Sequence, residues 1–141
     1  MNSSRSVGAN LAMSEPLYVL DASALLATLF QEPGSDAVES VLPGARMSAV
    51  NFSEVVAKLS DHGLDNADIL RDLAELDIVV CDLDRRQAEA AGLLRRGTKA
   101  AGLSLGDRAC LALTATLGGI AVTADRAWAK LTLDVAIQVV R

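Results

Sequence analysis

The chain has 141 residues, a length that suits one domain. Hydrophobic residues make up 51% of it and charged residues 22%, the balance of a globular protein with a full core rather than of a disordered chain. One Trp, one Tyr and two Phe are too few for a base-stacking platform of the kind that single-strand RNA readers use. The net charge of −5 argues against a nucleic-acid partner, although acids gathered to hold a metal ion would lower it without covering the surface.

Cysteine usage and the N-terminal stretch point to a cytoplasmic protein. Cys81 and Cys110 each lie in an apolar run, which favours two buried, reduced thiols over a disulfide. No run of about 18 apolar residues occurs, so no transmembrane helix is expected and the membrane is excluded as a partner. Residues 1–15 are rich in Ser, Asn and Gly and lack the apolar block of a signal peptide. We expect a disordered extension over 1–15 and a single domain over 16–141.

The first half of the chain alternates short apolar runs with helical patterns. Residues 17–20 predict a buried strand that ends at Asp21. Ser23 is expected to cap a helix over 24–31, which Pro33 and Gly34 end. Further helices are predicted over 35–42, 49–61 and 65–76, and strands over 46–48 and 78–81.

The second half repeats this alternation. Asp84 is expected to cap a long helix that reaches about Arg96, followed by a loop over 97–104. Asp107 would open a helix over 108–117, which Gly118 ends. The remaining predictions are a strand over 120–123, a turn or short helix over 124–130, and a strand over 135–140. Helices alternating with strands predict an α/β fold, with a parallel, doubly wound sheet covered by helices on both faces.

Four acids, far apart in sequence, stand where such a sheet binds ligands. Ligands of open parallel sheets bind just beyond the C-terminal ends of the strands. Asp21 directly follows one predicted strand, and Asp125 follows another after a single Ala. Asp107 lies in the first turn of its helix, and Glu54 shares a helix face with Asn51.

Each acid also has an ordinary structural explanation. Asp21 can be a helix cap, and Asp107 can simply complement a helix dipole. Asp125 can be a turn residue, and Glu54 can be a solvated partner of Lys58 four positions on. Taken singly, none of the four decides between these explanations and a functional site.

As a set, the acids point to metal-dependent chemistry. Several carboxylates in one pocket repel each other unless protons or cations neutralise them. Oxygen ligands suit Mg²⁺ or Mn²⁺. His62 is the only histidine and sits at a predicted helix end, so an acid–base pair of histidines is excluded. No Gly-rich phosphate loop is present either, which leaves metal-activated water as the best nucleophile.

Four segments resemble the PIN-domain family, and within it the VapC toxins of type II toxin–antitoxin systems. They occur in the family's order and spacing, and the resemblance covers about 17–141. The segments are Val19-Leu20-Asp21-Ala22-Ser23-Ala24-Leu25, Ser48-Ala49-Val50-Asn51-Phe52-Ser53-Glu54-Val55, Leu103-Ser104-Leu105-Gly106-Asp107-Arg108-Ala109-Cys110-Leu111-Ala112 and Val122-Thr123-Ala124-Asp125-Arg126-Ala127-Trp128.

The resemblance implies a three-layer α/β/α fold with a short central parallel sheet of about five strands, and a metal-dependent endoribonuclease. By analogy Asp21 and Asp107 would bind the principal Mg²⁺ or Mn²⁺ ion. Glu54 would share that ion or orient the attacking water, and Asp125 would complete the cluster. Supporting roles fall to three further residues: Ser23 and Thr123, which match small hydroxyl positions lining such sites, and Asn51, which would brace the helix of Glu54.

The resemblance also implies partners: an RNA substrate, a cognate antitoxin protein and a second copy of the chain in a homodimer. Arg108 and Arg126 each directly follow a site acid and are candidates for contacts with RNA phosphates. Two other classes stay open. One is a catalytically silent PIN-like module that binds RNA or protein. The other is a phosphoryl-accepting domain, although the second Asp that such phosphatases carry is replaced here by Ser23.

Overall fold

Five parallel strands form the centre of the molecule, in the order β4-β3-β2-β5-β6. The computed structural model describes residues 15–141, so the extension expected over 1–15 lies outside the described residues except for Glu15. The strands are β2 (Tyr18–Leu20), β3 (Ala45–Ser48), β4 (Ile78–Cys81), β5 (Ile120–Thr123) and β6 (Ala136–Val139). Every pair of neighbours is parallel, which confirms the predicted α/β class and sheet.

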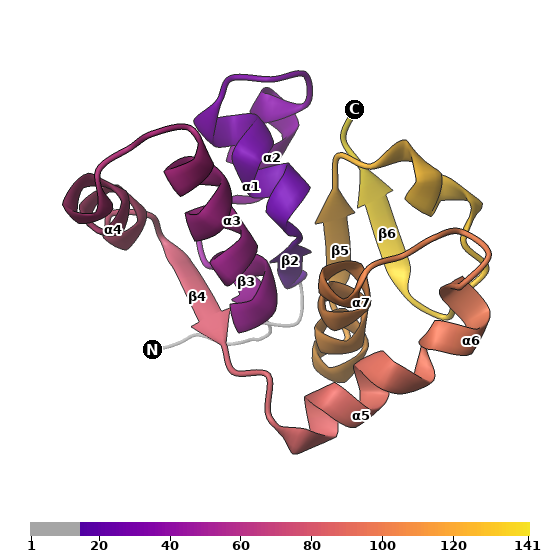
Figure 1. Ribbon diagram of the computed structural model, residues 1–141. Helices are drawn as coiled ribbons and strands as arrows, with labels where there is room; N and C mark the ends of the chain where they lie inside the picture. Colours follow the sequence, from indigo (N-terminus) through magenta and orange to yellow (C-terminus); the bar gives the residue numbers. More distant parts are fainter. Residues whose placement is uncertain (1–14) are drawn as a thin grey trace, which may run out of the picture.

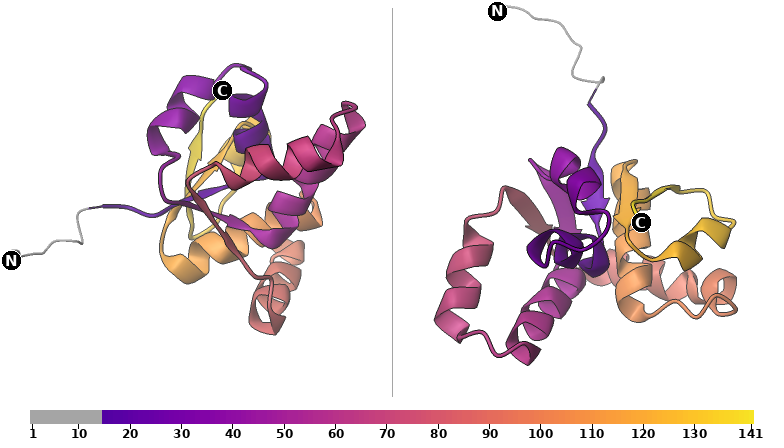
Figure 2. Two further views of the ribbon diagram at one scale, coloured as in Figure 1. Left: turned by 90° about the vertical axis from the view of Figure 1, so that its left-hand side faces the viewer. Right: turned by 90° about the horizontal axis from the view of Figure 1, so that it is seen from above.

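Helices cover both faces of this sheet, as Figures 1 and 2 show. On β2, Leu20 packs into a cluster with residues from α1, α3 and α4, whereas Val19 packs into a second cluster with residues from α7. This alternation is what a strand buried on both faces requires, since successive side chains point to opposite sides. The helices of the described residues are α1 (Ala22–Leu29), α2 (Ser35–Val41), α3 (Ala49–Asp61), α4 (Asn66–Ala74), α5 (Arg85–Leu93), α6 (Arg95–Thr98) and α7 (Leu105–Leu117), with the 3₁₀ helix η2 (Arg126–Lys130).

Several helix boundaries differ from the sequence expectation, and at the starts of α1 and α7 the capping residue explains the difference. α1 is capped by Asp21, not by Ser23, because the Asp21 carboxylate accepts the amide of Ala24. α7 is capped by Ser104 and begins before Asp107. The long helix predicted up to Arg96 ends at Leu93, and α6 takes up part of the expected loop.

A close backbone approach fixes the end of the chain beside the turn between α1 and α2. Gly34 has φ +97°, a conformation that favours glycine, and a Cβ there would lie 2.8 Å from the carbonyl oxygen of Val140. Next to this contact the guanidinium of Arg141 pairs with Glu32 at 3.2 Å and donates to the carbonyl of Pro33. The end of the chain, which follows β6, is thereby held against the turn that follows α1.

Two further expectations can be compared with the structure. Cys81 and Cys110 are both free thiols, as predicted, but only Cys110 is fully buried. None of the helices within residues 15–141 is long and apolar enough to cross a membrane.

Candidate active site

Asp21 lies at the C-terminal end of the central strand β2 and is 3% exposed. Its carboxylate accepts three hydrogen bonds: from the backbone amide of Ala24 at 2.8 Å, from the hydroxyl of Ser23 at 2.8 Å, and from the hydroxyl of Thr123. Burial raises the pKa of Asp21 to about 6, against the effect of these hydrogen bonds, and the charge of Asp107 adds to the rise. A carboxyl group in this state favours a proton or a cation beside it.

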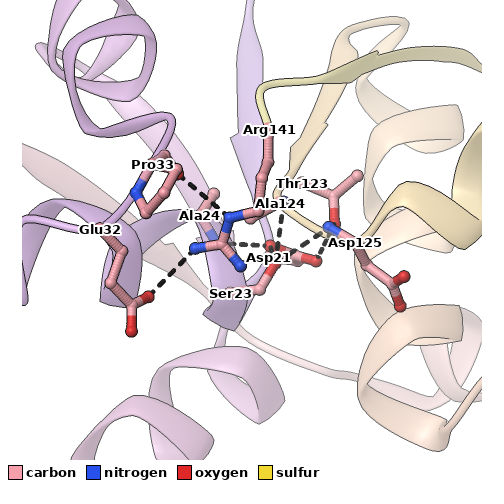
Figure 3. Close-up of polar contacts among 9 residues, drawn as sticks. All are labelled: Asp21, Ser23, Ala24, Glu32, Pro33, Thr123, Ala124, Asp125 and Arg141. Atoms are coloured by element: carbon pink, nitrogen blue, oxygen red, sulfur yellow. Dashed lines mark hydrogen bonds and ion pairs between the residues drawn. The ribbon is translucent and has the colours of Figure 1, made fainter.

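Ser23 and Thr123 join the ends of two neighbouring strands around Asp21 (Figure 3). The Ser23 hydroxyl accepts the amide of Ala124 at 2.9 Å, and the Thr123 hydroxyl accepts the amide of Asp125 at 3.0 Å. The structure therefore places both predicted hydroxyl residues in contact with Asp21. Their role is to fix the carboxylate, since each donates its hydroxyl proton to it.

Glu54 approaches the site from α3, held by Asn51 one helical turn earlier. The side-chain amide of Asn51 donates to Glu54 at 3.2 Å and to the carbonyl oxygen of Gly106 at 3.0 Å. Asn51 is buried, so this bridge ties α3 to the first turn of α7. Partial burial raises the pKa of Glu54, and Asp107 contributes to the rise. Asn51 was predicted to brace the helix of Glu54, and in the structure its side chain contacts both Glu54 and α7.

Gly106 is a site residue that the sequence analysis missed. A Cβ on Gly106 would lie 2.7 Å from the carboxylate carbon of Glu54, so glycine at this position lets the Glu54 carboxylate keep its present place. Glycine in the first turn of a helix costs about 1 kcal/mol relative to alanine, and this unfavourable choice is the signal that could have identified it.

Asp107 is the electrostatic link between the other two acids, because its charge contributes to the raised pKa of both Asp21 and Glu54. Its side chain also closes a capping box at the start of α7. The carboxylate accepts the amide of Ser104 at 3.0 Å, and the Ser104 hydroxyl accepts the amide of Asp107 at 3.1 Å. Asp107 therefore has a structural role at the start of α7, and its charge also acts on Asp21 and Glu54.

Asp125 stands apart from the other three acids. It is exposed and caps η2 by accepting the amide of Ala127 at 2.9 Å. Its backbone is tied to Thr123, but its charge is not among the causes of the raised pKa values of Asp21 or Glu54. Asp125 thus lies at the predicted edge of the sheet, and its carboxylate caps η2.

The two arginines predicted to contact phosphates differ in their surroundings. Arg126 is exposed at the start of η2, next to Asp125. Arg108 is half-buried and donates to the carbonyl oxygen of Ala91 on α5 at 3.0 Å. In this structure Arg108 therefore joins α7 to α5, and Arg126 is the accessible one of the two, next to Asp125.

The acids suit a divalent cation in their chemistry. All are oxygen donors, as Mg²⁺ and Mn²⁺ prefer, and two have pKa values raised by burial and by a neighbouring negative charge. Within residues 15–141, however, no three His, Cys, Asp or Glu side chains are grouped closely enough to hold one ion. The oxygen donors fit a divalent metal in their chemistry, while one carboxylate oxygen of Asp107 is engaged in the capping box with Ser104.

Comparison with known proteins agrees with the fold and with the sequence resemblance. The PIN domain family matches residues 18–132. No curated protein sequence matches the chain. The fold is similar to that of DNA-bound VapBC from Salmonella typhimurium, with a TM-score of 0.68 and 14% identity over 90% of this chain and 100% of that one. It is also similar to VapBC-1 from nontypeable Haemophilus influenzae, with a TM-score of 0.66 and 18% identity over 87% and 97% of the two chains.

A toxin–antitoxin complex from Klebsiella pneumoniae is similar at a TM-score of 0.66 and 18% identity, over 80% of this chain and 91% of that one. At such identities these likenesses establish the three-layer fold. The family match is independent of them and spans all of the structure from β2 to η2, including the four acids, Asn51 and the two hydroxyl residues. The chain belongs to the PIN domain family.

Proposed function

We propose that the chain is a metal-dependent endoribonuclease that hydrolyses RNA phosphodiesters, and that it is the toxin of a type II toxin–antitoxin pair. PIN domains of the VapC type are generally nucleases, and PIN nucleases generally use divalent metals. The observation that carries the proposal is the state of Asp21. It is buried at the C-terminal end of the central strand, and its pKa of about 6 is raised by burial and by Asp107.

Asp21, Glu54 and Asp107 would hold an Mg²⁺ or Mn²⁺ ion, with Asp125 completing the acidic set. When bound, the ion would neutralise these carboxylates and supply the charge that activates water and stabilises the phosphate in the reaction. The rest of the site keeps the ligands in place: Ser23 and Thr123 orient Asp21, and Asn51 orients Glu54. Such fixed ligands reduce the reorganisation that binding and reaction require.

The proposed substrate and partners follow from the same site. Arg126 is exposed beside Asp125 and would contact an RNA phosphate. The solved structures that share this fold include toxin–antitoxin complexes, which supports a cognate antitoxin as protein partner. We further propose a homodimer and a cytoplasmic location, where the RNA substrate is found.

The decisive experiment is RNA cleavage by the purified protein with Mg²⁺ or Mn²⁺, with and without a chelator. We expect cleavage that the chelator abolishes and that Asp21→Asn lacks. Asp65→Asn is a matched control, because Asp65 also caps a helix, α4, but is exposed and outside the site. This control variant should cleave RNA as the wild type does.

Two results would contradict the nuclease proposal. Equal cleavage by Asp21→Asn and wild type would show that the activity belongs to another site or to a contaminant. RNA binding without cleavage by the wild type, under every metal tested, would instead support the silent PIN-like module.

A further inference from the structure

A pocket of about 470 Å³ opens beside the acidic site, between α1, the C-terminal end of α3 and the end of the chain. Its lining includes Ser23, Phe30, Glu32, Lys58, His62 and Arg141. None of these residues except Ser23 takes part in holding the acids. The pocket is therefore a separate feature that the proposed cleavage chemistry leaves unexplained.

An aromatic pair forms one part of the pocket. The rings of Phe30 and His62 lie with their centroids 4.6 Å apart and their planes 31° from parallel. His62 Nδ1 donates to the carbonyl oxygen of Lys58 at 2.9 Å, which fixes the orientation of the exposed imidazole. A fixed ring pair at a pocket wall offers a stacking surface, and every nucleobase has a flat face that such a surface accepts.

Among the side chains that line the pocket, cationic groups outnumber acidic ones, whereas the chain as a whole is acidic. Lys58 and Arg141 supply two cationic side chains, and Glu32 is the one acidic side chain among the lining residues. Arg141 contacts Glu32 at 3.2 Å and the carbonyl oxygen of Pro33, as Figure 3 shows. These contacts fix its guanidinium, which also lines the pocket. A local excess of positive charge on a chain with a net charge of −5 suits an anionic ligand such as a phosphodiester.

Ser23 connects the pocket to the acids. It lines the pocket, and its hydroxyl donates to the Asp21 carboxylate at 2.8 Å. A ligand in the pocket would therefore lie directly beside the place where the proposed scissile phosphate meets Asp21.

We propose that this pocket binds one nucleotide of the RNA next to the cleaved bond, with its base against Phe30 and His62 and its phosphate at Lys58 and Arg141. One ring pair holds one base, which agrees with an aromatic content too low for an extended stacking platform. The placement next to a cleaved bond rests on the proposed nuclease function, whereas binding itself does not.

Binding is measured by fluorescence anisotropy of a short, labelled single-stranded RNA, with chelator present so that no cleavage occurs. An abasic ribose-phosphate oligomer of the same length is the second ligand. We expect His62→Gln to weaken RNA binding about tenfold, the loss of one stacked base, and to leave binding of the abasic oligomer unchanged. His62→Phe keeps a ring and should retain RNA binding, which separates stacking from a role for the imidazole charge.

Lys58→Gln should weaken binding of both ligands, because it removes a phosphate contact rather than a base contact. Arg71→Gln is the matched control, because Arg71 is an exposed cation on α4, outside the pocket. Its substitution should weaken the binding of either ligand less than Lys58→Gln does. Each of these side chains is exposed, so the variants should fold, and their melting temperatures check this.

The proposal is overturned if wild type does not bind the RNA, or if His62→Gln binds both ligands as the wild type does. The second result would leave the pocket to another occupant, such as a segment of a partner protein. Cleavage with metal is scored separately. RNA binding that depends on His62 without any cleavage would keep the nucleotide pocket and remove the nuclease proposal.

Discussion

The protonation of Asp21 couples the site to pH. The pKa of Asp21 is about 6 in the folded protein, against an ordinary value of 3.8. The folded state thus holds the proton more tightly than the unfolded state does. Without metal, the contribution of Asp21 to stability is fully present below about pH 4 and is lost as the pH rises through about 6, a change of about 3 kcal/mol.

Asp21→Asn should therefore become more stable than the wild type in chelator as the pH rises. Asparagine cannot ionise, so the difference in melting temperature between the two proteins should grow between about pH 4 and pH 6 and then level off. Thermal denaturation over this pH range measures it. If the melting temperatures of the two proteins changed in parallel at all pH values, burial would not raise the pKa of Asp21.

Gly106 allows a test of the position of Glu54 that leaves every acid in place. In Gly106→Ala the new methyl group takes the space of the Glu54 carboxylate, which lies at the end of a flexible side chain and will move away. We expect cleavage to fall at least about tenfold, while alanine, as a better helix former, keeps or raises stability by up to about 1 kcal/mol.

Gly92→Ala is the control for this variant. Gly92 lies in α5, and a Cβ there would meet nothing within 4 Å. It should show the helix stabilisation with full cleavage. If Gly106→Ala cleaves as well as Gly92→Ala, the contact between Glu54 and α7 has no part in catalysis.

At the scale of elements, the capping box at the start of α7 fixes the position of the Asp107 side chain. Ser104 and Asp107 satisfy each other's backbone amides in the capping box. Ser104→Ala should lower the free energy of unfolding by about 1 kcal/mol, whereas Ser104→Thr keeps a capping hydroxyl and should lose less. Because neither change removes an acid of the site, cleavage should persist in both variants. Cleavage as low as in Asp21→Asn would show instead that the box itself holds Asp107 in its working position.

The sequence predicted the elements well and their starting residues less well. Buried strands such as β5 are short apolar runs with clear limits, so β5 was predicted with the bounds that the structure shows. The predicted start of α1 was wrong because Asp and Ser are both favoured at the N-cap, and the sequence offers Asp21 and Ser23 there. What favours Asp21 is its hydrogen bond with Thr123, a residue 102 positions away that no local pattern reveals.

In the candidate site, too, local patterns could be predicted and contacts between distant residues could not. Acids that follow strands, such as Asp21, could be predicted from the topology of parallel sheets. The space that Gly106 leaves for Glu54 could not, because it arises where α3 packs against α7. The capping-box bond of Asp107 was likewise hidden, since the predicted helix began three residues too late to include Ser104 as its cap.

At the scale of the whole molecule, the negative charge favours the binding of a divalent cation, which in turn stabilises the folded state. The chain carries a net charge of −5, and three of its acids interact across the end of the sheet. A divalent ion that binds the folded state alone stabilises it by about 2.7 kcal/mol when its concentration is 100 times the dissociation constant. Mg²⁺ or Mn²⁺ should therefore raise the melting temperature of the wild type at pH 8, where Asp21 is ionised.

Mg²⁺ or Mn²⁺ should raise the melting temperature of Asp21→Asn only slightly, because this variant has lost a proposed ligand. The melting temperature of Asp65→Asn should rise as much as that of the wild type. Sodium chloride at matched ionic strength separates binding from screening, because screening acts on all three proteins alike. At pH 5 the effect on the wild type should shrink, since the proton on Asp21 then competes with the ion. Equal stabilisation of wild type and Asp21→Asn would place the ion elsewhere, and the net charge of the molecule would then oppose RNA binding without compensation from the site.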